Sequence, residues 1–203
     1  FFKQYAPWFF RIVYELVAID VGPKARNLVK RLPEDAIILN VGSGVRHVHP
    51  RVINLDLNSE QGVDLVASAY QLPLRDETVD LVISESMLEH LEHPEIAVRE
   101  MHRVLKKGAR AYILTPFVVG FHSSPNDFYR WTIPGMKILL SDFEVTEAGV
   151  AVGPTCALTW MLREWLAILF SFGSKRLYQV WTLVFMVLLM PLNVLDLVLA
   201  RYS

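Results

Sequence analysis

Short apolar runs recur between residues 37 and 115, and polar or charged stretches separate them. The runs have the length of buried strands. Their Val, Ile and Leu residues leave no polar face, which is typical of parallel sheets covered on both sides. The pattern predicts strands at residues 37–41, 51–56, 63–67, 79–84 and 111–115.

One stretch between these strands has helical spacing. Apolar residues alternate with charged ones over residues 94–106, Pro94 suits a first helical turn, and Gly108 suits the stop after two lysines. Strands that alternate with helices predict an α/β fold, here a Rossmann-like, mostly parallel sheet with helices on both faces.

The last quarter of the chain is far more apolar, and residues 156–172 and 177–199 have the pattern of two helices. The run from Leu177 to Leu195 holds 19 residues without a charge. A helix of that length is roughly 28 Å long, close to the bilayer's hydrocarbon thickness of about 30 Å. Because Pro191 interrupts the run, we expect a C-terminal apolar helical hairpin that lies in one leaflet or covers a ligand pocket. The alternative is that the pair packs on the sheet, or on a second subunit, as ordinary core.

These patterns divide the chain into three parts. We expect an N-terminal amphipathic helical segment at residues 1–31, a Rossmann-like domain at residues 32–155, and an apolar helical extension at residues 156–203. The opening segment is rich in aromatic residues and lacks the basic and small-residue features of a signal peptide.

Composition excludes several classes of function. The 20 Lys and Arg residues nearly balance the 21 Asp and Glu residues, so no overall positive field exists to hold nucleic acid. The single cysteine, Cys156, excludes a disulfide framework and is expected to be a small buried apolar residue. The order Glu-His-Leu-Glu-His at residues 89–93 matches neither common helical zinc motif, so we expect no metal.

Polar residues follow two of the predicted strands. Gly42-Ser43-Gly44 ends the first strand, and Asp56 ends the second. A glycine turn lets a ligand approach the backbone, and a carboxylate can accept hydrogen bonds from both hydroxyls of a ribose. Each feature alone is also consistent with a plain turn or a solvated strand end. Together they indicate an adenosine-containing ligand, but His47 breaks the glycine pattern of a dinucleotide site.

Six segments follow one another along the predicted strands and the helix between them: Leu39–Gly44, Asn54–Asp56, Ala69–Leu74, Val79–Ser84, Leu88–His90 and Glu100–Gly108. In this order and spacing they resemble the motifs of class I S-adenosylmethionine-dependent methyltransferases of the ubiquinone/menaquinone-methyltransferase-like kind. The resemblance is close over residues 32–115 and looser to about residue 153.

The resemblance implies that S-adenosylmethionine is the cofactor and assigns residues to it. The turn Gly42-Ser43-Gly44 would pass under the methionine part, and Asp56 would bind the ribose hydroxyls. The other implied cofactor-binding residues are Asn40 near the amino group, Leu57, Ser68 and Ala69 around the adenine, and Ser84 and Glu85 beside the carboxypropyl chain and the sulfonium.

The chain departs from the family pattern at two places. Asn40 stands where relatives often have an acidic residue, and only seven residues separate Gly44 from Val52, too few for a full crossover helix. Both departures favour an alternative function, a catalytically weak or inactive methyltransferase-like subunit that binds a membrane partner through its apolar helices.

The segment after the fifth strand, residues 116–132, concentrates polar side chains at the ligand end of the sheet. It resembles a loop in relatives found among polysaccharide and cell-envelope genes. We expect His122 to be the general base for an oxygen acceptor, with Asp127 and Tyr129 also catalytic and Arg130 shaping the pocket. Equally, Asp127 and Arg130 could form a structural ion pair, with Trp131-Thr132 capping the next helix.

The sequence thus predicts a methyltransferase that acts on a small-molecule or lipid-linked acceptor, such as a sugar or an envelope precursor. We expect a bacterial, cytoplasmic protein that is peripheral on the inner face of the cell membrane. Its apolar helices also allow a homo-oligomer, and we expect no nucleic-acid partner.

Overall fold

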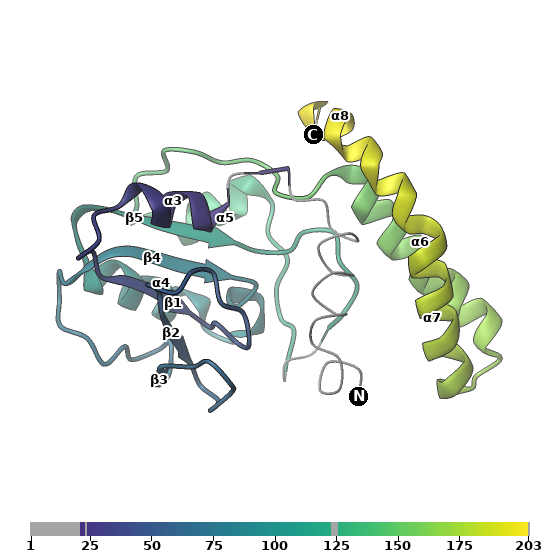
Figure 1. Ribbon diagram of the computed structural model, residues 1–203, viewed down its shortest axis with the longest axis horizontal. Helices are drawn as coiled ribbons and strands as arrows, with labels where there is room; N and C mark the ends of the chain where they lie inside the picture. Colours follow the sequence, from purple (N-terminus) through teal and green to yellow (C-terminus); the bar gives the residue numbers. More distant parts are fainter. Residues whose placement is uncertain (1–20, 23, 123–125, 203) are drawn as a thin grey trace. The chain divides into compact units, whose positions relative to one another are not determined.

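The computed structural model describes residues 21–22, 24–122 and 126–202 (Figure 1). Most of the predicted N-terminal segment 1–31 lies outside these residues. Within it the structure describes one helix, α3 (Ala25–Arg31).

Five parallel strands form the sheet, in the order β3-β2-β1-β4-β5. The order reverses at β1, which pairs with β2 on one side and β4 on the other. In open α/β sheets, ligands bind at such a reversal, outside the carboxyl ends of the strands. Because each strand pairs in parallel with its neighbours, the predicted mostly parallel sheet is confirmed. The strands are β1 (Ile38–Val41), β2 (Ile53–Asp56), β3 (Leu65–Val66), β4 (Val79–Glu85) and β5 (Leu105–Leu114).

Helices cover both faces of the sheet. Because neighbouring residues of a strand point to opposite faces, one strand contacts helices on both sides. Ile38 packs in a cluster with Val29 of α3, whereas the next residue, Leu39, packs with Met101 of helix α4 (Pro94–Val104). Helix α5 (Ile133–Leu139) packs on the same side as α4. Helices on both faces confirm the predicted fold class.

The boundary between α4 and β5 differs from the prediction. The helix predicted to residue 106 ends at Val104, and β5 begins at Leu105 rather than at residue 111. Leu105 pairs with Val79, and the ladder shifts register before Leu81. Lys106 adds two 2.8 Å hydrogen bonds to the carboxylate of Asp80 on β4. These contacts between strands override the helical periodicity, which continues past the true end of the helix.

The apolar tail belongs to a second compact unit, which contains residues 118–120 and 149 onward. The tail begins with a helical hairpin of α6 (Pro154–Ser171) and α7 (Lys175–Leu189). The second predicted helix, residues 177–199, is not continuous. It narrows to the 3₁₀ segment η2 (Met190–Leu195) and continues as α8 (Asp196–Leu199) and η3 (Ala200–Tyr202).

Two polar residues around this narrowing turn toward α6. Asn193 is buried, and its Oδ1 accepts a hydrogen bond from Thr159 at 2.8 Å. Asp196 is fully buried, and its two oxygens accept from the backbone N–H groups of Thr155 and Cys156 at 2.8 Å each. Asp196 therefore caps the N-terminus of α6 from about 40 residues away in sequence. A Cβ at Gly153 would lie 2.5 Å from the carboxyl carbon of Asp196, so the absence of a side chain there makes room for the carboxylate.

By length and composition alone, one stretch of the described chain, Lys175–Tyr202, could cross a membrane. Little of it is buried.

Replacing Asp196 with Ala removes both acceptors and leaves two amide donors without partners. We expect Asp196→Ala to lower the free energy of unfolding of this unit by about 1–2 kcal/mol, and Asp196→Asn, which keeps one acceptor, to lower it less. Urea unfolding of the full chain, followed by far-UV circular dichroism, measures the loss. Asp142→Ala removes an exposed carboxylate and is the control. Equal unfolding midpoints for Asp196→Ala and Asp142→Ala would contradict the capping role.

Candidate functional site

The glycine turn after β1 and the carboxylate at the end of β2 are joined by hydrogen bonds. The backbone N–H of Gly44 donates to Oδ2 of Asp56 at 2.8 Å, and the N–H groups of Gly42 and Ser43 donate to the carbonyl of Leu55 at 2.8 and 3.1 Å. The other carboxylate oxygen of Asp56 accepts from the N–H of Asn58 at 3.0 Å. Each oxygen keeps a second lone pair for a ligand, so the side chain can still accept from two hydroxyls.

The two glycines of the turn are required for different reasons. Gly42 has φ +73°, and a Cβ there would lie 2.1 Å from Cγ of Met87, so no side chain fits. Gly44 has φ +50°, and a Cβ there would meet no atom of the described chain within 4 Å. The space above Gly44 is therefore open to a ligand.

Asn40 is buried, and its side-chain amide is engaged within the sheet. Its Nδ2 donates to Oδ1 of Asn54 on β2 at 3.2 Å, and Nδ2 of Asn54 lies 3.2 Å from Nδ1 of His47. The connection between β1 and β2 is described throughout and contains no helix, as its short length predicts. His47 instead lies over Gly62, where a Cβ would lie 1.8 Å from its ring.

The other implied cofactor-binding residues lie at the carboxyl end of β4 or follow the carboxyl ends of β2 and β3. Leu57 is 67% exposed, and Ser68 accepts from the N–H of Tyr70 at 3.2 Å, with Ala69 beside it. Ser84 is buried, and its hydroxyl has no hydrogen-bond partner among the described residues. Glu85 pairs with Arg46 of the glycine-turn segment at 3.2 Å.

The predicted catalytic segment is held by an ion pair. The carboxylate of Asp127 accepts from both terminal nitrogens of Arg130, at 2.5 and 2.6 Å, and from the backbone N–H of His122 at 2.9 Å. The hydrogen bonds from Arg130 hold the pKa of Asp127 well below its usual range. Asp127 is thus an acceptor that stays charged, and it forms an ion pair with Arg130.

Two further residues of this segment make contacts with neighbouring segments. The hydroxyl of Tyr129 donates to the backbone carbonyl of Glu92 at 2.9 Å, and its ring stacks on Trp131. The side chain of Thr132 accepts from the N–H of Gly135 at 3.2 Å and caps α5.

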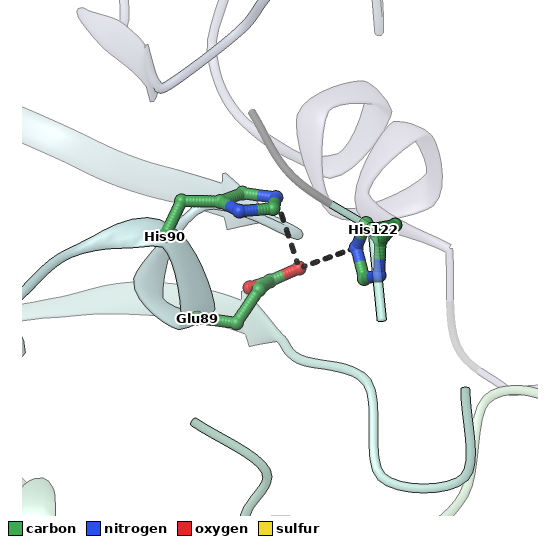
Figure 2. A group of neighbouring side chains, drawn as sticks. All are labelled: Glu89, His90 and His122. Atoms are coloured by element: carbon green, nitrogen blue, oxygen red, sulfur yellow. Dashed lines mark ion pairs between the residues drawn. The ribbon is translucent and has the colours of Figure 1, made fainter. Parts of the chain in front are cut away.

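A buried carboxylate meets two imidazoles beside this ion pair. Glu89, in the short segment η1 (Leu88–His90) after β4, is fully buried. Figure 2 shows one of its oxygens facing the rings of His90 and His122, and Nε2 of each ring lies 3.8 Å from Oε1. Burial raises the pKa of Glu89. The backbone carbonyl of Glu89 accepts from the N–H of Phe128 at 2.7 Å, which ties the two segments together.

The sequence does not predict the contact between Glu89 and His122, because the chain pattern groups Glu89 with its neighbours at residues 90–93. Glu92 and His93 are exposed and do not join the group, whereas His122 comes from 33 residues farther along. The available signal was the strand: η1 and the segment after β5 follow adjacent parallel strands, so they meet at one edge of the sheet. Cys156 is buried, as predicted.

The sequence pattern of the methyltransferase-domain family matches residues 3–113. No curated protein matches the chain. Among solved structures, the chain is similar to phosphoethanolamine N-methyltransferase 2 of Haemonchus contortus, with 14% identity and a TM-score of 0.56 over 89% of this chain and 53% of that one. It is also similar to a Bacillus halodurans protein provisionally identified as a methyltransferase, with 18% identity and a TM-score of 0.52 over 76% of this chain and 86% of that one.

A third similar structure is a complex from Haloferax volcanii, between the Trm112 methyltransferase activator and a provisionally identified methyltransferase. The identity is 20% and the TM-score 0.46 over 59% of this chain. The chain spans 65% of the length of that match. At these identities the similarities to the Haemonchus contortus and Bacillus halodurans structures show a shared fold.

The Asp127–Arg130 pair gives stability a defined dependence on pH. The folded pKa of Asp127 is depressed, so its contribution is complete above the unfolded value of about 3.9 and is lost as pH falls from there through the folded pKa. We expect the difference in urea midpoint between the wild type and Asp127→Asn to be largest near neutral pH and to shrink below about pH 4. A difference that stays constant down to pH 2 would contradict this assignment.

Proposed function

Because this chain belongs to the methyltransferase-domain family, we propose that it transfers a methyl group from S-adenosylmethionine to an oxygen of its acceptor. The observation that supports this most directly is the contact between Gly44 and Asp56, at the point where the strand order reverses. It combines an open backbone approach with a carboxylate suited to ribose hydroxyls.

The residues around this contact fit the adenosyl group. Space above Gly44 is free of described side chains, and Asp56 retains acceptor capacity. Leu57 is exposed at the same strand end and offers an apolar surface for a base. The hydroxyl of Ser84, which has no partner among the described residues, provides a polar group at the end of β4, on the side where the methionine part would lie.

The chemistry requires positioning and removal of a proton. When bound, S-adenosylmethionine supplies an electrophilic methyl group on its sulfonium. The turn at residues 42–44 and Asp56 would orient the donor. The acceptor oxygen must align with the methyl group and lose its proton.

His122 is the proposed general base in this reaction. Its side chain is 36% exposed, so an acceptor can reach it, and its Nδ1 lies 3.5 Å from Oδ2 of Asp127. The carboxylate of Asp127, on the Nδ1 side of the ring, would orient the imidazole so that Nε2 can take the proton of the acceptor. Asp127 is then a positioning residue, and Tyr129 positions the segment through Glu92.

Asp56 is the decisive residue for cofactor binding. We expect Asp56→Ala to weaken binding of both S-adenosylmethionine and S-adenosylhomocysteine at least about tenfold, because hydrogen bonds to a charged group contribute roughly 1.5–3 kcal/mol. Isothermal calorimetry on the full chain measures this, with Asp142→Ala as the control at an exposed carboxylate. Unchanged binding in Asp56→Ala would remove the assignment. No heat from the wild type with either compound would favour the non-catalytic subunit, which the engaged amide of Asn40 also suits.

The second unit supports a proposed location on a membrane surface. Exposed apolar side chains on α6 recur at helical spacing, so they form one stripe. Glu164 lies off this stripe and is held by Arg163 at 2.7 Å and by the hydroxyl of Tyr178 on α7 at 2.5 Å. Such an amphipathic surface suits a helix lying in one leaflet, and a protein held at a membrane would be near an acceptor linked to a lipid. The stripe consists of Leu158, Met161, Trp165 and Ile168.

Flotation with vesicles of phosphatidylcholine and phosphatidylglycerol tests this location. We expect the wild type to float, and the double variant Trp165→Gln, Ile168→Gln to partition at least about tenfold less, because each buried apolar side chain contributes roughly 1.5–3 kcal/mol. Ile138→Gln removes an exposed isoleucine from α5 and serves as the control. A wild type that stays at the bottom of the gradient would exclude a membrane surface.

A further inference from the structure

We propose that Glu89, His90 and His122 form a binding site for one divalent transition-metal ion, of the zinc or iron(II) type. One oxygen of Glu89 and one nitrogen of each imidazole lie within 4.8 Å of one another. The three side chains come from two segments that meet at one edge of the sheet, and Figure 2 shows them converging. This inference concerns ion binding and stands independently of methyl transfer.

The first argument is the state of the carboxylate. Glu89 is fully buried, yet neither of its oxygens has a hydrogen-bond partner among the described residues. A buried carboxylate without hydrogen-bond donors is costly, and proteins normally pair such a group closely or use it to bind a metal. The neighbouring guanidinium of Arg130 is already engaged by both oxygens of Asp127. A cation beside Glu89 would balance the remaining charge.

The second argument is the geometry of the imidazoles. Nε2 of His90 and Nε2 of His122 each lie 3.8 Å from Oε1 of Glu89, which is too far for a hydrogen bond. Ligand atoms around one zinc ion lie roughly 3–3.5 Å apart, since its bonds are about 2.0–2.2 Å long. Small rotations of the two rings would therefore bring the three atoms to coordinating distance.

The third argument is the environment of the opposite ring nitrogens. Nδ1 of His90 lies 2.5 Å from the backbone carbonyl of Asn126, which can only accept, so this nitrogen carries the proton and Nε2 of the neutral ring has the lone pair. Nδ1 of His122 lies 3.5 Å from Oδ2 of Asp127, and a terminal nitrogen of Arg130, which can only donate, lies 3.4 Å from the same Nδ1. Binding of an ion through Nε2 therefore requires the tautomer in which Nδ1 of His122 carries the proton and faces Asp127. Histidines that bind metals through one nitrogen typically have the other held by a carbonyl or carboxylate.

The ligand set indicates the class of ion. Two imidazoles and one carboxylate suit zinc, iron(II) or cobalt(II), whereas magnesium and calcium prefer oxygen ligands. Three protein ligands leave a position open, and the partial exposure of His122 allows water or an acceptor oxygen to reach it. With the ion bound, Nε2 of His122 cannot act as the general base. The pH profile of methyl transfer should therefore differ between ion-free and ion-loaded chain.

The test uses cobalt(II) and zinc(II) with the purified full chain, first stripped by a chelator and without S-adenosylmethionine. We expect one cobalt(II) per chain, with the absorption bands of a low-symmetry site, and displacement by zinc(II). Loss of a residue that only holds a ligating histidine typically costs about 10–100-fold in metal affinity, and loss of a ligand itself should cost more. We therefore expect Glu89→Gln, His90→Ala and His122→Ala each to weaken cobalt(II) binding more than about 100-fold. His93→Ala, which changes an exposed histidine nearby, should alter the affinity less than about twofold.

Folding is checked on the same samples by thermal unfolding in chelator. Glu89→Gln keeps the shape of the side chain and removes an unpaired charge, so it should be at least as stable as the ion-free wild type, yet gain no stability from zinc(II). Three results would overturn the site: no one-to-one cobalt(II) binding by the wild type, equal binding by Glu89→Gln, or displacement of cobalt(II) by equimolar magnesium. None of these bears on the calorimetry with Asp56→Ala, so the ion site and methyl transfer can fail separately.

Discussion

The parallel pairing of β1 with β2 is the constraint on which the proposed cofactor site depends. Residue pairing such as Val41 with Leu55 brings both strands to an end at the same edge. The amide of Gly44 then lies at the carboxylate of Asp56, 12 residues away. Gly42 admits no side chain because Met87, after β4, packs against its Cα. Three strand ends therefore fix one turn, and its shape does not depend on a crossover helix.

Much of this arrangement could be predicted from the sequence, because it follows from local patterns and the rules of parallel sheets. Apolar runs locate the strands, and strands that run parallel bring Gly42-Ser43-Gly44 and Asp56 to one edge. The start of β5 was misplaced because Lys106 and Lys107 continue a helical pattern of charge. What ends the helix there is pairing with β4, and a single segment carries no signal for its partner.

The Glu89 group could not be predicted for a similar reason. The proposed ion site needs His122 as a ligand. The chain pattern groups only residues 89–93, which include His93 and match neither helical zinc motif. Which carboxylate is buried depends on how η1 packs, which no periodicity encodes. The contacts of Asp127 with Arg130 and of Tyr129 with the carbonyl of Glu92 likewise depend on how the segments pack, and the catalytic roles predicted for both residues stay predictions.

Two carboxylates in the described part of the chain, Glu89 and Asp196, are fully buried, and their surroundings differ. Asp196 is satisfied by the first amides of α6, whereas Glu89 has no such donors among the described residues. The difference has a consequence for how the chain is made. A ribosome synthesises the start of α6 long before Asp196 leaves the exit tunnel. Until then, the first amides of the strongly apolar helix α6 lack the acceptors that Asp196 provides. A chaperone or a bilayer would bind this helix most readily during that interval.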